Sequence, residues 1–460
     1  MQEKRIAIRK PYQNEIIETI PMDNDTIFAI ASGAGRAAIA VLRLSGPSTR
    51  LIVKSIAGKL PGPRMAVLAT FRDPATGKAI DKGLVIFFPG PKSFTGEDYA
   101  EFQCHGGRAV VGAMVKAIGG INGTRPAEPG EFTRRALTNG KMDLAEVEGL
   151  ADLIDAETEW QRRAALRQTE GVLGRQAAIW RSALIEAAAL LEAEIDFPEE
   201  EDVPGASGRR AGEILAPVLA GLKSELAAAI IGERLRDGVT IVIAGPPNAG
   251  KSTLLNALAR RDVAIVSPFA GTTRDIITLH IDLGGCPVTL IDTAGLRESS
   301  DVVEQIGVFR AREKAKAADL ILWLSEASAP VPPGLQGSDV WPVFTKLDLL
   351  PPDEKSSLDQ GVWISAETGK NIDVLIKRME DFARAAVGGG HAGLIARERH
   401  RKAFDSAAQA LERVLTNPEA PTELLAEDLR VAMFSLQRLT GAVDVEDILG
   451  EIFSRFCIGK

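Results

Sequence analysis

The feature that most constrains this chain is a phosphate-binding loop at residues 245–252, whose sequence GPPNAGKS matches the pattern GxxxxGK[S/T]. The β-branched run at 239–244 predicts a buried parallel strand before the loop, and residues 253–259 predict a helix after it. In this context, backbone N–H groups and the positive end of the helix dipole bind a di- or triphosphate. Lys251 can reach the outer phosphates, and the Ser252 hydroxyl can bind Mg²⁺. A chance turn rarely meets both the spacing and the context, so we predict a nucleotide-binding domain.

Length and composition indicate several globular domains. The chain has 460 residues, of which 45% are hydrophobic and 25% charged, so we expect two to four domains with separate cores. The net charge of −8 argues against a large basic surface for nucleic acid. The spacing of Cys104, Cys286 and Cys457 suits neither a disulfide framework nor a metal site. Without an unbroken apolar run of membrane-span length or a signal peptide in the first 21 residues, we expect a cytoplasmic protein and no membrane partner.

The residue pattern divides the chain into four segments. Residues 22–140 combine strand patterns with Gly and Pro turn signals, which predicts an α+β domain. Residues 141–236 are rich in Ala, Leu, Glu and Arg at helical spacing, and helical patterning returns at 388–460. Residues 237–387 alternate strands and helices, the pattern of a doubly wound parallel sheet. We therefore predict an N-terminal α+β domain and a discontinuous helical domain with an inserted α/β, Ras-like P-loop domain.

Four further segments of the nucleotide domain occur in the order expected of a GTPase. Residues 271–275 (GTTRD) predict a switch loop in which a threonine binds Mg²⁺ and senses the γ-phosphate. Residues 292–295 (DTAG) supply an aspartate that holds Mg²⁺ through water and a glycine that bonds the γ-phosphate. In residues 345–348 (TKLD), the aspartate can pair with the guanine N1–H and 2-amino group. Residues 364–367 (ISAE) fit a loop that contacts guanine O6, so we predict GTP as the nucleotide.

Two positions depart from the usual GTPase pattern. Thr345 stands where the base-reading loop normally begins with Asn, which removes an amide that braces the loop and contacts the base, so we expect Asp348 to keep guanine selectivity at lower affinity. Leu296 stands where many GTPases have a water-orienting Gln, so another group must orient water. Transition-state charge also needs a cation, worth about 10³–10⁵ in rate when an arginine supplies it. Asn248 is a candidate ligand for a monovalent cation, although an exposed loop asparagine fits its spacing equally well.

The chain ends in the sequence FCIGK at residues 456–460. A cysteine fourth from the end is reminiscent of a prenylation signal, but Gly459 and Lys460 fit that signal poorly. Cys457 is therefore either a small buried thiol in a frayed tail or a nucleophile activated by neighbouring Arg455 or Lys460.

Further motifs along the chain carry a resemblance to one family. With the GTPase segments, they resemble the MnmE (TrmE) family of tRNA uridine 5-carboxymethylaminomethyl modification GTPases, on residues 23–27 (DNDTI), 42–46 (LRLSG), 129–133 (PGEFT), 139–144 (NGKMDL) and 457–460 (CIGK). The resemblance runs from Met22 to Lys460, and the first 21 residues have no counterpart in the family pattern.

For the N-terminal domain, the resemblance implies folate binding and constitutive homodimerisation. The ligand would be a 5-formyl- or 5,10-methylene-tetrahydrofolate. Its contacts match Arg43, Glu101, Lys141 and Lys460. A carboxylate suits the paired donors of the pterin, and cations suit the glutamate tail. Read singly, Arg43 and Lys141 would pass as surface charges.

For the nucleotide domain, the resemblance implies Mg²⁺ bound by Ser252 and Thr273, and K⁺ that stimulates hydrolysis when two nucleotide domains meet. The K⁺ ligands match Asn248, Ser267, Phe269 and Thr272. Glu304, in residues 303–307 (VEQIG), matches the water-orienting catalytic acid, and Cys457 matches a cysteine implicated in tRNA modification. The full set of GTP contacts predicted from motifs and resemblance is Asn248, Ala249, Gly250, Lys251, Ser252, Thr253, Ser267, Pro268, Phe269, Ala270, Gly271, Thr272, Thr273, Asp292, Thr293, Ala294, Gly295, Thr345, Lys346, Leu347, Asp348, Ser365, Ala366 and Glu367.

The resemblance also implies a partner and a pathway. A FAD-dependent protein, GidA/MnmG, would join this chain in a heterotetramer that adds an aminomethyl or carboxymethylaminomethyl group to C5 of the wobble uridine in certain tRNAs. The folate would supply the one-carbon unit, and GTP hydrolysis would open and close the nucleotide domains through the flanking helices. Two alternatives remain. A ribosome-assembly GTPase would need a basic RNA-binding domain that this chain lacks, and a folate-dependent transferase with a regulatory GTPase insert would act without the FAD partner.

Overall fold

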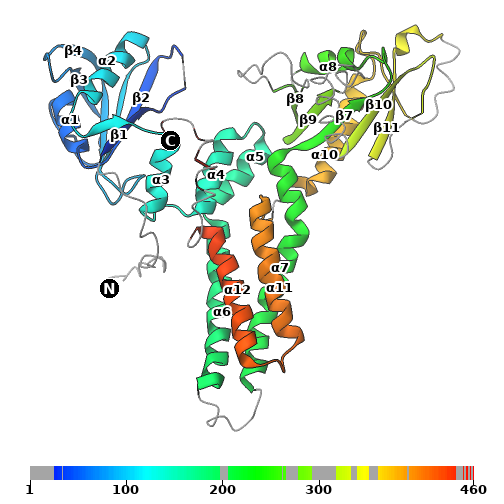
Figure 1. Ribbon diagram of the computed structural model, residues 1–460. Coiled ribbons are helices and arrows are strands. Elements are labelled where there is room, and N and C mark those ends of the chain that lie inside the picture. Colours follow the sequence, from blue (N-terminus) through cyan, green and yellow to red (C-terminus); the bar gives the residue numbers. More distant parts are fainter. Residues whose placement is uncertain are drawn as a thin grey trace, which may run out of the picture. The chain divides into compact units, whose positions relative to one another are not determined.

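The structure is a computed structural model that describes residues 25–33, 35–196, 206–261, 263–265, 278–292, 318–332, 339–351, 361–390, 393–441, 449, 452–453, 456 and 459. It divides into two compact units. The first contains Met1–Ala151, Leu173–Ala178 and Phe434–Lys460, and the second contains Asp152–Val172 and Ile179–Met433. Each unit combines helices with one six-stranded sheet, which confirms the predicted mixture of α+β and α/β folds (Figure 1). The exact boundaries at 140, 236 and 387 stay predictions.

The first unit is built on a mainly antiparallel sheet with the order β3-β4-β5-β2-β1-β6. Its strands are β1 (Thr26–Ile30), β2 (Ile39–Ser45), β3 (Val67–Arg72), β4 (Ala79–Phe88), β5 (Tyr99–His105) and β6 (Thr124–Pro126), and β6 runs parallel to β1. Side chains alternate along β2, so Leu42 and Leu44 enter the core while Arg43 between them does not. Helices α1 (Thr49–Ala57) and α2 (Arg108–Gly119) cover the core face. The other face is therefore the one that presents Arg43.

Helix α3 (Glu131–Thr138) is held in this unit by a buried polar network. Glu131 is 2% exposed and bonds Arg125 at 2.7 Å and Arg135 at 3.2 Å. Arg135 also reaches Glu97 at 3.1 Å. Gly130, directly before the helix, has φ +68, and a Cβ there would lie 2.8 Å from the Phe453 ring. The PGEFT motif is thus explained by close packing and by a satisfied buried ion-pair network.

The sheet of the second unit has the order β12-β11-β10-β7-β9-β8 and is parallel except for β8. Its strands are β7 (Val239–Ala244), β8 (Thr278–Leu283), β9 (Cys286–Asp292), β10 (Leu320–Glu326), β11 (Asp339–Thr345) and β12 (Val362–Trp363). Helices α8 (Lys251–Ala259) and α10 (Ile372–Ala386) pack on it through Leu254, Leu258, Leu375 and Met379. The short β-branched strands are buried, as expected of a parallel sheet covered by helices.

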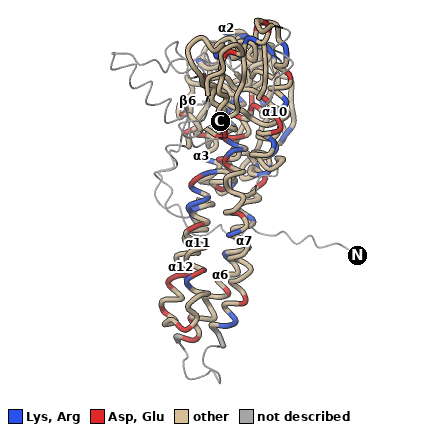
Figure 2. Tube along the Cα trace, turned by 90° about the vertical axis from the view of Figure 1, so that its right-hand side faces the viewer, with Lys and Arg blue, Asp and Glu red and all other residues tan. Residues whose placement is uncertain are grey.

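Helices lie on both sides of the nucleotide domain in the chain, as predicted for a discontinuous helical domain. They are α4 (Leu144–Asp155), α5 (Glu159–Thr169), α6 (Val172–Asp196), α7 (Ala206–Asp237), α11 (Glu398–Thr416) and α12 (Thr422–Thr440). Helices α7 and α11, one from each side, lie next to each other (Figure 1), joined by an ion pair of 2.6 Å between Lys223 and Glu412. Charges of both signs lie along these helices (Figure 2). Helix α7 continues into β7 through Gly238, whose φ is +87.

Helix α7 also contains the stretch Gly208–Asp237, which is long and apolar enough to cross a membrane by length and composition, with a mean hydropathy of 1.8 in its most apolar part. The core helix of a helical bundle meets the same criteria. In the apolar middle of the helix, at residues 215–232, both charged side chains have partners in the protein. Lys223 pairs with Glu412, and the Glu225 carboxylate accepts a 2.7 Å hydrogen bond from Leu394 N. We therefore interpret α7 as a bundle helix.

Candidate functional site

The parallel strands of the second unit bring the predicted nucleotide motifs to one edge of the sheet. The phosphate loop follows β7, Asp292 ends β9, Thr345 ends β11, and Ser365 follows β12. Since the carboxyl ends of parallel strands meet at the same edge, segments far apart in sequence converge there. This edge is where open α/β sheets bind ligands.

The phosphate loop has a backbone that only certain residues can adopt. Gly245 has φ +145, and a Cβ at this position would lie 2.1 Å from Leu324 O. Gly250 has φ +86 and precedes α8, while Asn248 is one of the few non-glycine residues with positive φ, at +64. Lys251 Nζ donates to Gly245 O at 2.9 Å and to Pro246 O at 3.0 Å. The lysine cation therefore lies across the loop, next to the N-terminus of α8, where an anion binds favourably.

Two oxygen atoms suited to Mg²⁺ lie beside this loop. Ser252 Oγ is 3.3 Å from Asp292 Oδ2, and Asp292 is 3% exposed. Hydroxyl and carboxylate oxygens are the donors that Mg²⁺ prefers, usually together with phosphate oxygens and water. The pair therefore fits the predicted magnesium site. Among the described residues, no three or more His, Cys, Asp or Glu side chains are placed to hold a metal ion by themselves, so a metal here would depend on the nucleotide for other ligands.

The two segments predicted to bind the guanine base, at residues 345–348 and 364–367, lie together at the ends of β11 and β12. Asp348 is exposed on the short 3₁₀ turn Leu347–Leu349. Leu347 N donates to Ile364 O at 3.0 Å, which joins the TKLD and ISAE segments. Ser365 is fully buried, and its hydroxyl accepts from Thr368 N at 3.1 Å. In this arrangement the exposed Asp348 carboxylate can pair with the N–H edge of a guanine.

Thr345, which stands in place of the usual asparagine, is buried and contacts the phosphate loop. Its side chain is 2% exposed, and its hydroxyl donates to Ala249 O in the phosphate loop at 2.8 Å. This hydrogen bond holds the phosphate loop, whereas the asparagine amide that is missing here would brace the base-reading loop, so the expected drop in guanine affinity stays a prediction. Threonine still supplies no amide for the base.

Several predicted site residues lie outside the residues that the structure describes. They are the switch and K⁺ segment residues Ser267, Pro268, Phe269, Ala270, Gly271, Thr272 and Thr273, the residues Thr293, Ala294 and Gly295, the predicted catalytic Glu304, and the tail residues Cys457 and Lys460. Their roles stay predictions.

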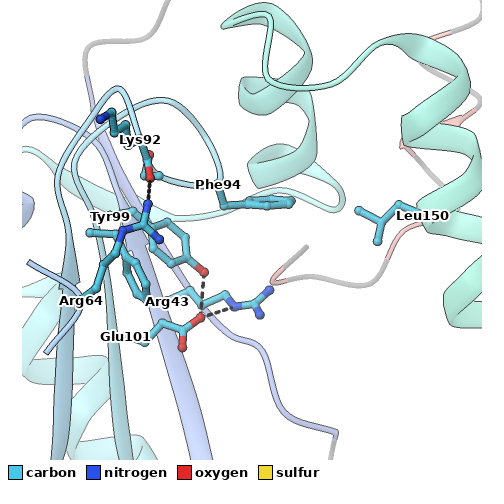
Figure 3. Close-up of a pocket in the computed structure, with 9 residues that line it drawn as sticks. Arg43, Arg64, Lys92, Phe94, Tyr99, Glu101 and Leu150 are labelled. Carbon is cyan, nitrogen blue, oxygen red and sulfur yellow. Dashed lines mark hydrogen bonds and ion pairs between the residues drawn. The ribbon is translucent and has the colours of Figure 1, made fainter. Parts of the chain in front are cut away.

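The first unit contains a second candidate site, a cavity of about 500 Å³ (Figure 3). It opens on the sheet face that carries Arg43 and combines cations, a carboxylate and aromatic rings. Its lining residues are Arg43, Arg64, Phe88, Lys92, Ser93, Phe94, Tyr99, Glu101 and Leu150. A cavity of this volume, with apolar walls and a few polar groups, is typical of a small-molecule site.

Arg43 and Glu101, predicted as ligand contacts, lie directly opposite each other on β2 and β5. Arg43 Nε is 3.2 Å from Glu101 Oε1, and the Tyr99 hydroxyl donates to the same oxygen at 3.1 Å (Figure 3). Burial raises the pKa of Tyr99, so its hydroxyl stays a hydrogen-bond donor at neutral pH. Arg43 Nη1 also donates to Gly459 O at 3.3 Å, which places Gly459 next to this cavity residue.

Two cationic side chains that were not predicted from the sequence, Arg64 and Lys92, line the cavity, whereas the predicted Lys141 does not. Arg64 and Lys92 line the cavity, and Arg64 lies over the Phe88 ring at 5.7 Å. These cations are 28 residues apart, and no motif links them, so only the fold could identify them. Lys141 does not line the cavity. Its ammonium group donates to Pro91 O at 3.0 Å, in the loop that carries Lys92.

The two cysteines that the structure describes are buried free thiols. Burial raises the pKa of Cys104, and it raises the pKa of Cys286 to about 12. Both are therefore neutral thiols near pH 7 and unsuited to nucleophilic chemistry.

Comparison with known proteins covers almost the whole chain. A family model described as "GTP-binding protein TrmE N-terminus" matches residues 26–141, and one described as "MnmE helical domain" matches residues 144–457. The chain is 59% identical to the tRNA modification GTPase MnmE of Beijerinckia indica over 437 residues, 95% of this chain and 96% of that protein. It is 51% identical over 446 residues to the protein of that name from a strain of Rhodopseudomonas palustris, covering 95% and 99% of the two chains. Identity to the protein of that name from Parvibaculum lavamentivorans is 50% over 453 residues, covering 95% and 100%.

Proposed function

Because this chain belongs to the MnmE family of tRNA modification GTPases, we propose that it hydrolyses GTP within a complex that modifies C5 of the wobble uridine in certain tRNAs. The group added would be carboxymethylaminomethyl or aminomethyl. The observation that carries the proposal is the near full-length identity to relatives of that name, together with the convergence of the phosphate loop, Asp292 and Asp348 at one sheet edge.

The described residues support specific roles in GTP binding. The phosphate-loop N–H groups and Lys251 neutralise the phosphates, and Asp348 pairs with guanine. Ser252 and Asp292 hold Mg²⁺, which stabilises charge on the phosphates when bound. We propose that Thr273 completes this magnesium site and that Glu304 orients the attacking water. Since Leu296 replaces the usual glutamine, a carboxylate elsewhere is needed to orient and deprotonate that water.

A monovalent cation would supply the remaining positive charge. We assign K⁺ to Asn248, Ser267, Phe269 and Thr272, in a site completed when two nucleotide domains of the homodimer meet. Asn248 is exposed on the phosphate loop in a left-handed backbone conformation, so its side chain is accessible to a ligand. That exposure and position support a ligand role.

The cavity of the first unit suits a reduced folate, in its 5-formyl or 5,10-methylene form. The Glu101 carboxylate can accept from the paired N–H donors of a pterin, and Phe88, Phe94 and Tyr99 can flank its ring. Arg64 and Lys92 are cations suited to the glutamate carboxylates. Lys460 would join them from the tail, whose Gly459 already contacts Arg43.

GTP hydrolysis would act on the helical domain through α5, and the packing of α5 against the β8–β9 hairpin supports this route. Trp160 N donates to Gly285 O at 3.3 Å at the tip of this hairpin, and the Trp160 ring lies under the Arg384 guanidinium at 5.9 Å. The hairpin connects the predicted switch loop at 271–275 to Asp292. A change at either end would therefore shift α5.

The proposal is tested by mass spectrometry of wobble uridines from a bacterial strain that lacks its own MnmE and carries this chain. We expect the 5-substituted uridine to return, and to need the FAD-dependent GidA/MnmG partner and Cys457. Modification without that partner would favour the one-carbon transferase alternative. GTP hydrolysis with no return of the modified uridine would favour a ribosome-assembly role.

A further inference from the structure

We propose that the cavity of the first unit prefers folates whose tail carries several glutamates, and that Arg64 and Lys92 select this polyglutamate form. The inference rests on the proposed folate site and deepens it, because it names the class of folate that the site takes. Each further γ-linked glutamate adds a carboxylate, which is ionised near pH 7. A site that prefers such a tail therefore needs several cations where the tail leaves the cavity.

The first observation is that three cations gather on one short loop at the cavity. The loop, residues 89–92, follows β4 and contains Lys92, which lines the cavity. Arg64 also lines the cavity and donates to Lys92 O, while Lys141 Nζ donates to Pro91 O at 3.0 Å. Two neighbouring carbonyls of the loop thus each accept from a cationic side chain. The fold brings together three positive charges that are far apart in the sequence.

The second observation is that these charges are not neutralised within the described part of the chain. Among the described residues, no carboxylate forms an ion pair with Arg64, Lys92 or Lys141. The carboxylates that follow the loop are each paired with another arginine, namely Glu97 with Arg135, Asp98 with Arg50 and Glu101 with Arg43. The bonds to the loop also leave N–H donors on both side chains, because arginine has five and lysine three. The group can therefore bind further carboxylates.

The third observation is the order of charges along the cavity. Figure 3 shows Lys92 well away from Glu101, the proposed pterin acceptor, with the Arg64 guanidinium bonded to the backbone of Lys92. Arg64 and Lys92 are both exposed as well as lining the cavity. A folate with its pterin at Glu101 therefore directs its tail toward these two cations, and further glutamates meet them as they reach solvent.

RNA phosphates would also suit exposed cations, but the position of Arg64 favours a ligand bound within the cavity. Its guanidinium lies over the Phe88 ring at 5.7 Å, and Phe88 is itself part of the cavity wall. The cations thus continue a small-molecule site. The net charge of −8 also gives the chain no large basic surface for nucleic acid.

The test measures, by calorimetric titration of the full-length protein, the Kd for the monoglutamate and the pentaglutamate of 5-formyl-tetrahydrofolate. We expect the pentaglutamate to bind about tenfold more tightly, since one exposed ion pair contributes little and several combine here. In Arg64→Gln/Lys92→Gln, we expect the two Kd values to come within about threefold of each other. Arg64→Lys/Lys92→Arg keeps both charges and should keep the preference. Lys59→Gln/Arg108→Gln removes the same two kinds of exposed cation near α1 and α2, outside the cavity, and as the matched control should also keep it.

Ionic strength provides a second measure that needs no variant, because salt screens exposed charge pairs. We expect the preference for the pentaglutamate to shrink as salt is added. Equal affinity of the unaltered protein for both folates would overturn the inference, as would a preference that the double glutamine variant retains. Weaker tRNA binding in that variant, without any folate preference in the unaltered protein, would assign the cations to RNA phosphates and overturn it as well. If neither folate binds, the proposed folate site itself is refuted.

Discussion

The side-chain oxygens of Ser252 and Asp292 lie 3.3 Å apart, although 40 residues separate them in the chain. Ser252 lies in the first turn of α8, and Asp292 is the last residue of β9. They meet because β7 and β9 are parallel neighbours whose register pairs Asp292 with Ile243, two residues before the phosphate loop begins at Gly245. The magnesium site thus follows from sheet topology.

Replacing Asp292 with Asn tests this site, because the amide keeps the shape and removes the negative charge. We expect GTP hydrolysis to fall by about 100-fold or more, and the Mg²⁺ concentration needed for half-maximal mant-GDP binding to rise. Magnesium titrations of binding and single-turnover hydrolysis measure the two effects. Asp339→Asn, an exposed aspartate at the start of β11, is the control. Unchanged Mg²⁺ dependence in Asp292→Asn would contradict the assignment.

Asn248 supplies a prediction about cation choice. With equal concentrations of KCl or NaCl, we expect faster hydrolysis in K⁺, and we expect this difference to vanish in Asn248→Ala. The alanine also strains the backbone, because residue 248 has φ +64. Asn248→Gly removes the amide without that strain, so it separates the two causes. K⁺ stimulation that persists in Asn248→Gly would show that the side chain is not a ligand.

The parts of the molecule that sequence could predict are those set by local chemistry. The phosphate loop combines glycines at positive φ with a strand before it and a helix after it, and all of these are encoded within about twenty residues. The β-branched run at 239–244 predicted β7 for the same reason, and the fold confirms it. Buried parallel strands and amphipathic helices have distinct residue patterns, so the fold class was also accessible.

What sequence could not supply depends on contacts between distant segments. The bond from Thr345 to Ala249 joins residues 96 positions apart, and its acceptor is a backbone carbonyl, which every residue has. Arg64 and Lys92 share a cavity because β3, β4 and the loop after β4 fold together, and no spacing rule relates them. The ammonium group of Lys141 bonds Pro91 O, a contact that its motif does not indicate, and its predicted role in folate binding stays a prediction.

Glu101 is predicted to be the folate-orienting carboxylate. Glu101→Gln keeps the size of the side chain and removes the charge that accepts hydrogen bonds from Arg43 and Tyr99. Since charge-assisted hydrogen bonds contribute about 1.5–3 kcal/mol, we expect the Kd for 5-formyl-tetrahydrofolate to rise about tenfold or more. Calorimetric titration measures it. Glu128→Gln, at an exposed carboxylate outside the cavity, is the control, and equal folate affinity in both variants would refute the role.

Glu131 gives a prediction about acid stability in the first unit. Burial acts to raise the pKa of Glu131, but hydrogen bonds from Arg125 and the Glu128 backbone outweigh it and hold the pKa below the ordinary 4.5. A carboxylate with a lowered folded-state pKa stabilises the fold above its unfolded pKa, and this stabilisation is lost as pH falls through the folded value. We therefore expect the backbone amides of α3 to be protected from hydrogen exchange near pH 7 and to lose this protection below about pH 4.5.

Hydrogen–deuterium exchange of peptides from α3 measures this, after correction for the intrinsic effect of pH on exchange. Glu131→Gln removes the buried negative charge that pairs with Arg125 and Arg135. We therefore expect the free energy of opening of α3, as measured by exchange at pH 7, to fall by about 3 kcal/mol. The variant and the unaltered protein should converge in acid, where Glu131 is protonated in both states. Glu128→Gln removes an exposed charge three residues earlier, and it should change the protection of α3 neither at pH 7 nor in acid. If the difference in α3 protection between Glu131→Gln and the unaltered protein were the same at all pH values, the buried ion pairs would not determine the pH at which α3 loses protection.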